Sequence, residues 1–355
     1  MATNNNDKTL NVPHLRFPEF NGEWEKKRIS EFCTLLKGTG ISKDQLSTNG
    51  NPCILYGELY TKYKAEIINE VLSCTELDAN TLVKSKVNDV IIPCSGETAI
   101  DIATARYVPF DDVLLGGDLN ILRSNKVNGS FLAYQLNGKR KYDIARVAQG
   151  VSVVHLYGEH LKNIVISLPV IEEQQKISRL LHLLDERIAT QNKIIEDLKK
   201  LKSAIRKKIF SLLKDEYTKS FEINQLLDYE QPTAYIVAND EYSTDTRLTP
   251  VLTANKGFIL GYTDEKNGIY QKGACIIFDD FTMDAKYVSF PFKVKSSAIK
   301  ILTAKPNVNL RFMFEYLSYW ELKSEEHKRH YISEISPLVI ELPSKEKQNI
   351  ITTVP

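Results

Sequence analysis

Several short loops of this 355-residue chain combine basic or aromatic side chains with glycine. One loop, from Lys37 to Lys43, reads Lys-Gly-Thr-Gly-Ile-Ser-Lys, and another, Tyr56–Tyr63, interleaves tyrosines with a glycine and Lys62. Glycine allows close approach to a phosphate, and Lys, Arg, Gln and Asn hydrogen-bond to phosphates and base edges. These residue types therefore favour contact with a nucleic acid.

The candidate contacts share a polar, basic or tyrosine side chain and a position in or beside an expected loop. In the first half of the chain they are Lys37, Lys43, Tyr60, Lys62, Ser95, Thr98, Lys139, Arg140, Lys141, Arg146, Gln149 and Ser152. In the second half they are Asn255, Lys256, Thr282, Lys328 and Arg329. Each also has a plainer interpretation, because a charged run is often only a solvated surface.

Acidic side chains give an alternative, catalytic interpretation. Asp279, Asp280 and Asp284, together with Glu97, could hold a metal ion in a nuclease. No second carboxylate cluster or catalytic lysine follows at nuclease spacing. Turn capping, or accepting a hydrogen bond from cytosine, explains the aspartates better.

Motifs that bind cofactors are absent from the sequence. It contains no Gly-x-Gly-x-x-Gly after a strand, no phosphate-binding P-loop and no Asn-Pro-Pro-Tyr-like motif of adenine methyltransferases. The five cysteines form no Cys-x-x-Cys pair, so we expect reduced thiols and no metal site. We expect no catalytic residue and no cofactor on this chain.

Charge and hydropathy exclude further classes. The net charge of +1 excludes a uniformly basic nucleic-acid coat but allows local basic patches. No apolar run is long enough to span a membrane, and the first residues do not resemble a signal peptide. We therefore expect a cytoplasmic protein.

A long helix must position these loops. Between Glu172 and Leu213 apolar residues recur in steps of three and four, which is typical of a coiled coil, and the segment contains neither Gly nor Pro. Pro169 just precedes it and favours a helix start. A helix of this length needs a partner helix, in this chain or another.

The flanking segments predict mixed α/β (α+β) domains. Helical spacing occurs at Phe131–Leu136 and Leu310–Trp320. Short apolar runs bounded by turn residues predict strands. They are Ile54–Tyr56, Val90–Cys94, Val113–Leu115, Asn120–Leu122, Val151–Leu156, Ile164–Leu168, Ala234–Val237, Gly257–Gly261, Ala274–Phe278, Ala298–Leu302 and Leu338–Leu342.

The two halves also repeat each other. The pattern Val-Ile-x-Leu-Pro-x-x-Glu-x-Gln-x-x-Ile begins at Val165 and again at Val339. In each half a mixed domain precedes it and a helix start follows it. The sequence therefore predicts a domain, a long helix, a second domain and the start of a second helix.

At this point the sequence resembles the specificity subunit of type I restriction-modification systems. Three motifs carry the resemblance: Val12–Phe20 with Gly22-Glu23-Trp24, then Leu168-Pro169-x-x-Glu172-Glu173-Gln174, then the partial copy Leu342-Pro343-x-x-Glu346-x-Gln348. The resemblance implies two target-recognition domains, at 1–170 and 218–343. It also implies a helical spacer at 171–217 and the start of a truncated distal helix at 344–355.

The same resemblance implies a non-catalytic subunit. Each target-recognition domain would read one half of a bipartite site in double-stranded DNA. The helical region would dock two adenine methyltransferase subunits and, through them, restriction and translocase subunits. S-adenosylmethionine, ATP and Mg²⁺ would then bind to the partners. We expect docking through Glu172, Gln174, Ile177, Leu181, Leu184, Ile188, Leu198, Ile205 and Ile209. The alternatives are a metal-dependent nuclease with a coiled-coil dimerisation arm and a coiled-coil adaptor that binds only proteins.

Overall fold

The computed structural model describes residues 11–213, 219–255, 257–320, 322 and 328–353. The chain divides into two compact units, Met1–Asn192 and Lys193–Pro355, and each is described by itself. Both units mix helices with strands, as the sequence predicts. None of the helices in the described ranges is sufficiently long and apolar to cross a membrane.

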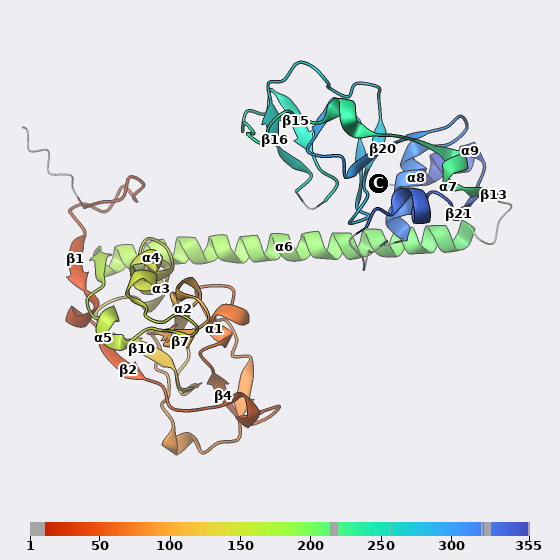
Figure 1. Cartoon of the computed structure of the whole chain (residues 1–355). Coiled ribbons are helices and arrows are strands. Elements are labelled where there is room, and N and C mark those ends of the chain that lie inside the picture. The colour runs from red at the N-terminus through yellow and green to blue at the C-terminus, as the bar shows by residue number, and fades with distance from the viewer. Residues whose placement is uncertain (1–10, 214–218, 256, 321, 323–327, 354–355) are drawn as a thin grey trace, which may run out of the picture. The chain divides into compact units, whose positions relative to one another are not determined.

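The long helix α6 runs without interruption from Ile171 to Leu213 (Figure 1). Its 43 residues give a length of about 64 Å. It begins one residue before the predicted start and ends at the predicted residue. Glu172 and Glu173 in its first turn complement the helix dipole. Its first turns belong to the first unit and its last turns to the second.

The first unit is built on a four-stranded antiparallel sheet in the order β2-β10-β6-β8. The bounds are β2 Thr34–Lys37, β10 Leu119–Arg123, β6 Asp89–Pro93 and β8 Arg106–Val108. Successive β6 residues contribute to different cores: Val90 and Ile92 pack in the cluster that contains helix α3 (Gly129–Asn137), and Ile91 packs in the other. A strand covered on both faces is expected to be continuously apolar, which explains the Val-Ile-Ile run.

Shorter elements complete the first unit. A second sheet has the order β3-β5-β4-β9, and β1 pairs with β12 next to the start of α6. The bounds are β1 Glu25–Arg28, β3 Leu46–Ser47, β4 Asn51–Ile54, α1 Glu58–Thr61, β5 Ser73–Thr75, β7 Ser95–Gly96, α2 Ala99–Ile102, β9 Leu114–Leu115, α4 Lys141–Val147, β11 Val154–His155, α5 Gly158–Leu161 and β12 Val165–Leu168.

The second unit repeats this plan. Its main sheet has the order β14-β20-β17-β18, and β13 pairs with β21 as β1 pairs with β12. The bounds are β13 Lys219–Glu222, α7 Ile223–Leu226, β14 Leu227–Glu230, β15 Thr249–Leu252, β16 Ile259–Thr263, β17 Cys275–Asp279, β18 Ala285–Val288, β19 Lys293–Val294, β20 Ile299–Ala304, α8 Leu310–Tyr319, β21 Val339–Leu342 and α9 Lys345–Thr353. The internal repeat seen in the sequence is therefore a repeat of structure.

Three predicted strands differ from the structure. The strand predicted at Ile54–Tyr56 shares only Ile54 with β4, which ends there. The segment predicted as a strand at Ala234–Val237 overlaps a 3-10 helix, Pro232–Tyr235, because Pro232 at its first position fixes φ and lacks an N–H for a ladder. The strand predicted at Val151–Leu156 is only Val154–His155. Residues before it form an exposed turn around Gly150, whose φ is +126°.

Candidate nucleic-acid interface

The start of α6 is fixed by a buried carboxylate. Glu173 is fully buried and accepts two hydrogen bonds from Arg16, at 2.8 and 2.7 Å, and one from the Trp24 indole N–H at 3.3 Å. Lys176, one turn further, pairs with Glu19 and lies 4.5 Å from the Phe17 ring centroid. The amino-terminal motif and the Glu-Glu-Gln motif, which are far apart in the sequence, are therefore in direct contact in the structure.

The next residue, Gln174, holds α3 against α6. It is 3% exposed, accepts from the Asn128 backbone N–H at 3.0 Å and donates to the Pro169 carbonyl at 2.8 Å. Asn128 is the N-cap of α3. The prediction that Gln174 docks a partner is wrong, because both ends of its buried amide already bind main-chain groups of this chain.

The second unit contains the same glutamine contact. Gln348, 1% exposed, accepts from the Asn309 N–H at 2.8 Å and donates to the Pro343 carbonyl at 2.9 Å. Asn309 caps α8 as Asn128 caps α3. The repeated Leu-Pro-x-x-Glu-x-Gln motif is thus explained by one repeated hydrogen-bonding arrangement, which we call the glutamine joint.

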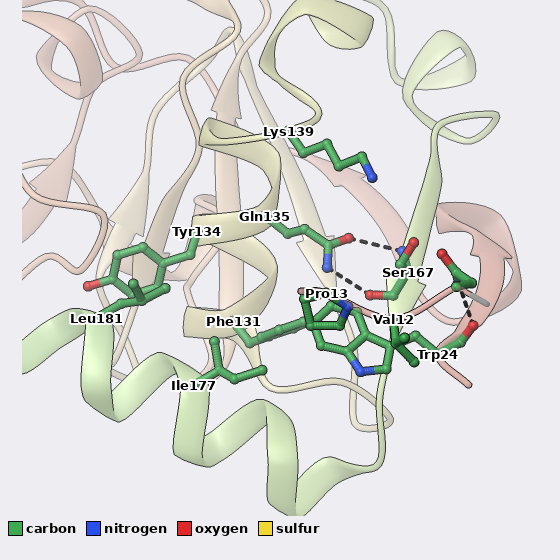
Figure 2. Close-up of a pocket in the computed structure, with 11 residues that line it drawn as sticks. Val12, Pro13, Trp24, Phe131, Tyr134, Gln135, Lys139, Ser167, Ile177 and Leu181 are labelled. Carbon is green, nitrogen blue, oxygen red and sulfur yellow. Dashed lines mark hydrogen bonds between the residues drawn. The ribbon is translucent and has the colours of Figure 1, made fainter. Parts of the chain in front are cut away.

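A pocket of about 280 Å³ lies where α3, β12, the first turns of α6 and the amino-terminal segment meet (Figure 2). Gln135 exchanges two hydrogen bonds with the Ser167 backbone, and Phe131 packs edge-on to Trp24. Two predicted docking residues, Ile177 and Leu181, line this pocket. In the second unit, Phe210 of α6 packs on Phe312, the equivalent of Phe131, with ring centroids 5.6 Å apart.

The remaining predicted docking residues lie along α6. Glu172, Leu184, Ile188, Leu198 and Ile205 are exposed, and Ile209 is half-buried. The predicted seam therefore leaves apolar side chains uncovered along the helix. Near the helix end, Arg206 forms two hydrogen bonds to one Glu315 oxygen, at 3.0 and 2.5 Å, which ties α6 to α8.

Several predicted contacts of the first unit gather at one end of its main sheet. Lys37 ends β2, and the Gly38 N–H bonds to Leu119 of the neighbouring strand β10. At the end of β6, the Cys94 N–H bonds to Asp118 and its carbonyl accepts from Leu156. A Cβ on Gly96 would lie 3.4 Å from the Tyr60 hydroxyl, so Tyr60 packs beside β7. Lys37, Tyr60 and the β7–β11 pair thus lie at the same end of the unit.

One glycine of the first loop is required for packing within the unit. A Cβ on Gly38 would lie 1.9 Å from the Gly116 carbonyl oxygen, so Gly38 permits two protein backbones to meet. Ser95 departs from its predicted role. It is 5% exposed and donates to the Asp118 carboxylate at 3.0 Å, so it is a positioning residue and not a surface contact.

Thr98, Gln149 and Ser152 belong to the same end of the unit. Strand β7 pairs with β11, and α2 contacts both strands and α4. Gln149 and Ser152 lie in the exposed turn that β11 closes, and Thr98 caps α2. Burial mainly, with the charges of Asp101 and Glu97 contributing, raises the pKa of Tyr60. These carboxylates make the charge of this surface mixed.

Other predicted contacts of the first unit lie elsewhere or are already paired. Lys139 lines the pocket next to α6, and Lys62 binds Glu58 at 2.6 Å. Arg140 pairs with Asp143 at 3.0 Å, and the largely exposed Arg146 lies 3.5 Å from the same carboxylate. Lys141 begins α4, and Lys43 begins an exposed 3-10 turn.

In the second unit, Thr282 and Arg329 lie near the β17–β18 turn. The Thr282 N–H bonds to Asp279 at 3.0 Å, and the Arg329 guanidinium lies 5.8 Å from the Phe281 ring centroid. Lys328 pairs with Glu334 at 2.9 Å, and this hydrogen bond is the main reason that the pKa of Glu334 is lowered. Asn255 is exposed in the β15–β16 turn, and Lys256 lies outside the described residues.

The three aspartates considered as nuclease metal ligands already bind other groups of this chain. Asp279 caps its own turn, and the buried Asp280 accepts from the Tyr331 N–H at 2.7 Å and lies 3.3 Å from Lys300. Asp284 accepts from Thr282, while Glu97 belongs to the other unit. Within the described ranges, no three His, Cys, Asp or Glu side chains gather as metal ligands.

Comparison with known proteins relates these features to a family. The chain is 45% identical over 129 residues to a specificity subunit of a type I restriction enzyme of Escherichia coli, and the match covers 34% of this chain and 31% of that protein. It is 25% identical over 386 residues to a putative type I restriction enzyme specificity subunit of Methanocaldococcus jannaschii, covering 97% of this chain and 88% of that one.

A solved structure has the same fold. The S subunit of a type I restriction-modification system from M. genitalium superposes with a TM-score of 0.68 at 16% identity, over 96% of this chain and 90% of that chain. Residues 21–200, which include the joint at Glu173 and Gln174, match the type I restriction modification DNA specificity domain. This chain belongs to the type I restriction modification DNA specificity family.

Proposed function

We propose that this chain is the non-catalytic, DNA-reading subunit of a type I restriction-modification complex. Each unit would read one half of a bipartite site in double-stranded DNA. The observation that carries the proposal is the repeated unit: two domains of the same topology, each joined to a helix through its own glutamine joint. Two similar readers on one chain are suited to a site with two specified blocks.

The surface chemistry supports a base-reading role for the first unit. Gln149, Ser152 and Thr98 are exposed polar side chains at one end of the sheet, with Lys37 nearby. Amide and hydroxyl groups bond to base edges, whereas lysine more often binds phosphate. The mixed charge around Glu97 and Asp101 favours selective contacts over general attraction to the DNA backbone.

The partners follow from α6. This helix carries apolar side chains that are exposed to solvent; Ile188 and Leu198, for example, are each 59% exposed. A helix with an uncovered apolar face is suited to packing against another helix. We propose that two adenine methyltransferase subunits dock here and that restriction and translocase subunits join through them. S-adenosylmethionine, ATP and Mg²⁺ would bind to those partners, in the cytoplasm.

Methylation mapping tests the proposal. The full chain is co-expressed with an adenine methyltransferase subunit of a type I system in a host without adenine methylation, and modified adenines are mapped across the genome. The expected result is one motif of two specified blocks separated by an unspecified gap, absent when the chain is omitted. A contiguous motif, or methylation independent of the chain, would overturn the proposal.

A further inference from the structure

An exposed turn of the first unit presents an apolar side chain to solvent. Val151 is 97% exposed and Val153 is 51% exposed. Main-chain hydrogen bonds in both directions between Gln149 and His155, at 2.9 and 2.7 Å, close the turn at its base. A Cβ on Gly150 would lie 2.1 Å from the Val153 carbonyl oxygen, so this turn conformation requires glycine. The valine is therefore held outward by a defined turn.

The elements around this turn also expose apolar surface. Helix α2 contacts both β11 and α4. Exposed apolar side chains lie on α2 (Ile100), on α4 (Tyr142) and in the segment that follows β11 (Tyr157). Gln149 and Ser152, which flank the valine, are exposed polar side chains. Such a combination is suited to the major-groove edge of an A·T pair, which offers polar atoms and the methyl group of thymine.

A valine side chain has no hydrogen bond to offer a phosphate or a polar base atom. In the major groove, the apolar group that distinguishes one base pair from another is the C5-methyl group of thymine. That groove is about 12 Å wide and admits an α-helix or a two-stranded β-ribbon, so a short turn closed by a pair of main-chain hydrogen bonds can enter it. Contact with a thymine methyl is thus the arrangement in which burial of the Val151 side chain contributes most to the free energy of binding.

We propose that Val151 selects thymine, by packing its methyl groups on the C5-methyl group of a thymine in the half-site read by the first unit. This inference rests on the proposed function and names the residue and the base for one contact. Gln149 and Ser152 then lie on either side of that contact, where they would bond to neighbouring base edges.

Replacing thymine by 2′-deoxyuridine removes only the methyl group and so tests the contact directly. The full chain, with its methyltransferase partner, is titrated with duplexes that carry the mapped site and a single deoxyuridine at each thymine position in turn. For the unaltered chain, one such replacement is expected to weaken binding about fourfold. Val151→Ala is expected to weaken binding to the natural site about fivefold to fifteenfold and to abolish the effect of that same deoxyuridine.

Val87→Ala provides the matched control, because Val87 is 52% exposed on the same unit and lies in the turn before β6. It should retain the natural affinity and the thymine dependence. The inference is overturned if the site is bound but Val151→Ala leaves every deoxyuridine effect unchanged. The inference is also overturned if Val151→Ala weakens binding while the deoxyuridine replacements have no effect on the unaltered chain. That result is expected if Val151 instead inserts between base pairs. Failure of the unaltered chain to bind any specific site refutes the proposed function itself.

Discussion

Replacing Gln174 by alanine should destabilise the first unit strongly. The substitution leaves the buried Asn128 N–H and the Pro169 carbonyl without their partner, at 3.0 and 2.8 Å in the present structure. Each buried main-chain group left unsatisfied costs about 1–3 kcal/mol, so the loss of two partners should lower the free energy of unfolding by about 2–6 kcal/mol. For a unit of this size, about 1 kcal/mol corresponds to about 2–4 °C in Tm.

Calorimetry of the full chain measures this directly, since the two units are expected to give separate contributions to the unfolding trace. The Tm of the first unit should fall by about 4–24 °C. Gln175→Ala is the control, because Gln175 is the exposed neighbour of Gln174 on the same helix. The joint has no energetic importance if Gln174→Ala and Gln175→Ala unfold at the same temperature.

Three further predictions concern other parts of the chain. Glu315→Ala removes both hydrogen bonds from Arg206 and should lower the free energy of unfolding of the second unit by about 1.5–3 kcal/mol in urea titrations, whereas an unchanged midpoint would refute this contribution. Burial raises the pKa of the Cys53 and Cys94 thiols to about 11, so their contribution to stability is complete below about pH 8.5 and is lost as the pH rises towards 11. Replacing both cysteines by alanine should reduce the fall in urea midpoint between pH 8 and 10.5, and an identical fall would contradict the assignment. Deleting the heptad Ile188–Ile194 shortens α6 by about 10 Å and should change the unread gap by about three base pairs or abolish binding, with both half-sites unchanged; an altered half-site sequence would argue against a spacer role.

Sequence periodicity predicted the elements whose residues interact mainly with near neighbours. The seam from Glu172 to Leu213 located α6 to within one residue, and the run at Val90–Cys94 located β6. A helix or a buried strand shows its exposed and covered faces as a local pattern, which a single sequence displays directly.

Contacts between distant residues could not be predicted in this way. Glu173 binds Arg16 across 157 positions, and Gln174 meets the Asn128 backbone across 46. The family resemblance implied partner contact for Gln174, although its side chain is buried. Aligning the two halves would have helped, since Asn309 precedes α8 as Asn128 precedes α3.

The glutamine joint also bears on how such a chain can change without losing its architecture. Gln174 binds a backbone N–H and a backbone carbonyl, and neither group depends on which side chain the residue carries. The recognition surface can therefore accumulate substitutions, or be exchanged whole for an unrelated one, and still present the same two groups to the helix. Because this contact uses main-chain groups of the unit, substitutions of surface side chains leave its two hydrogen bonds in place.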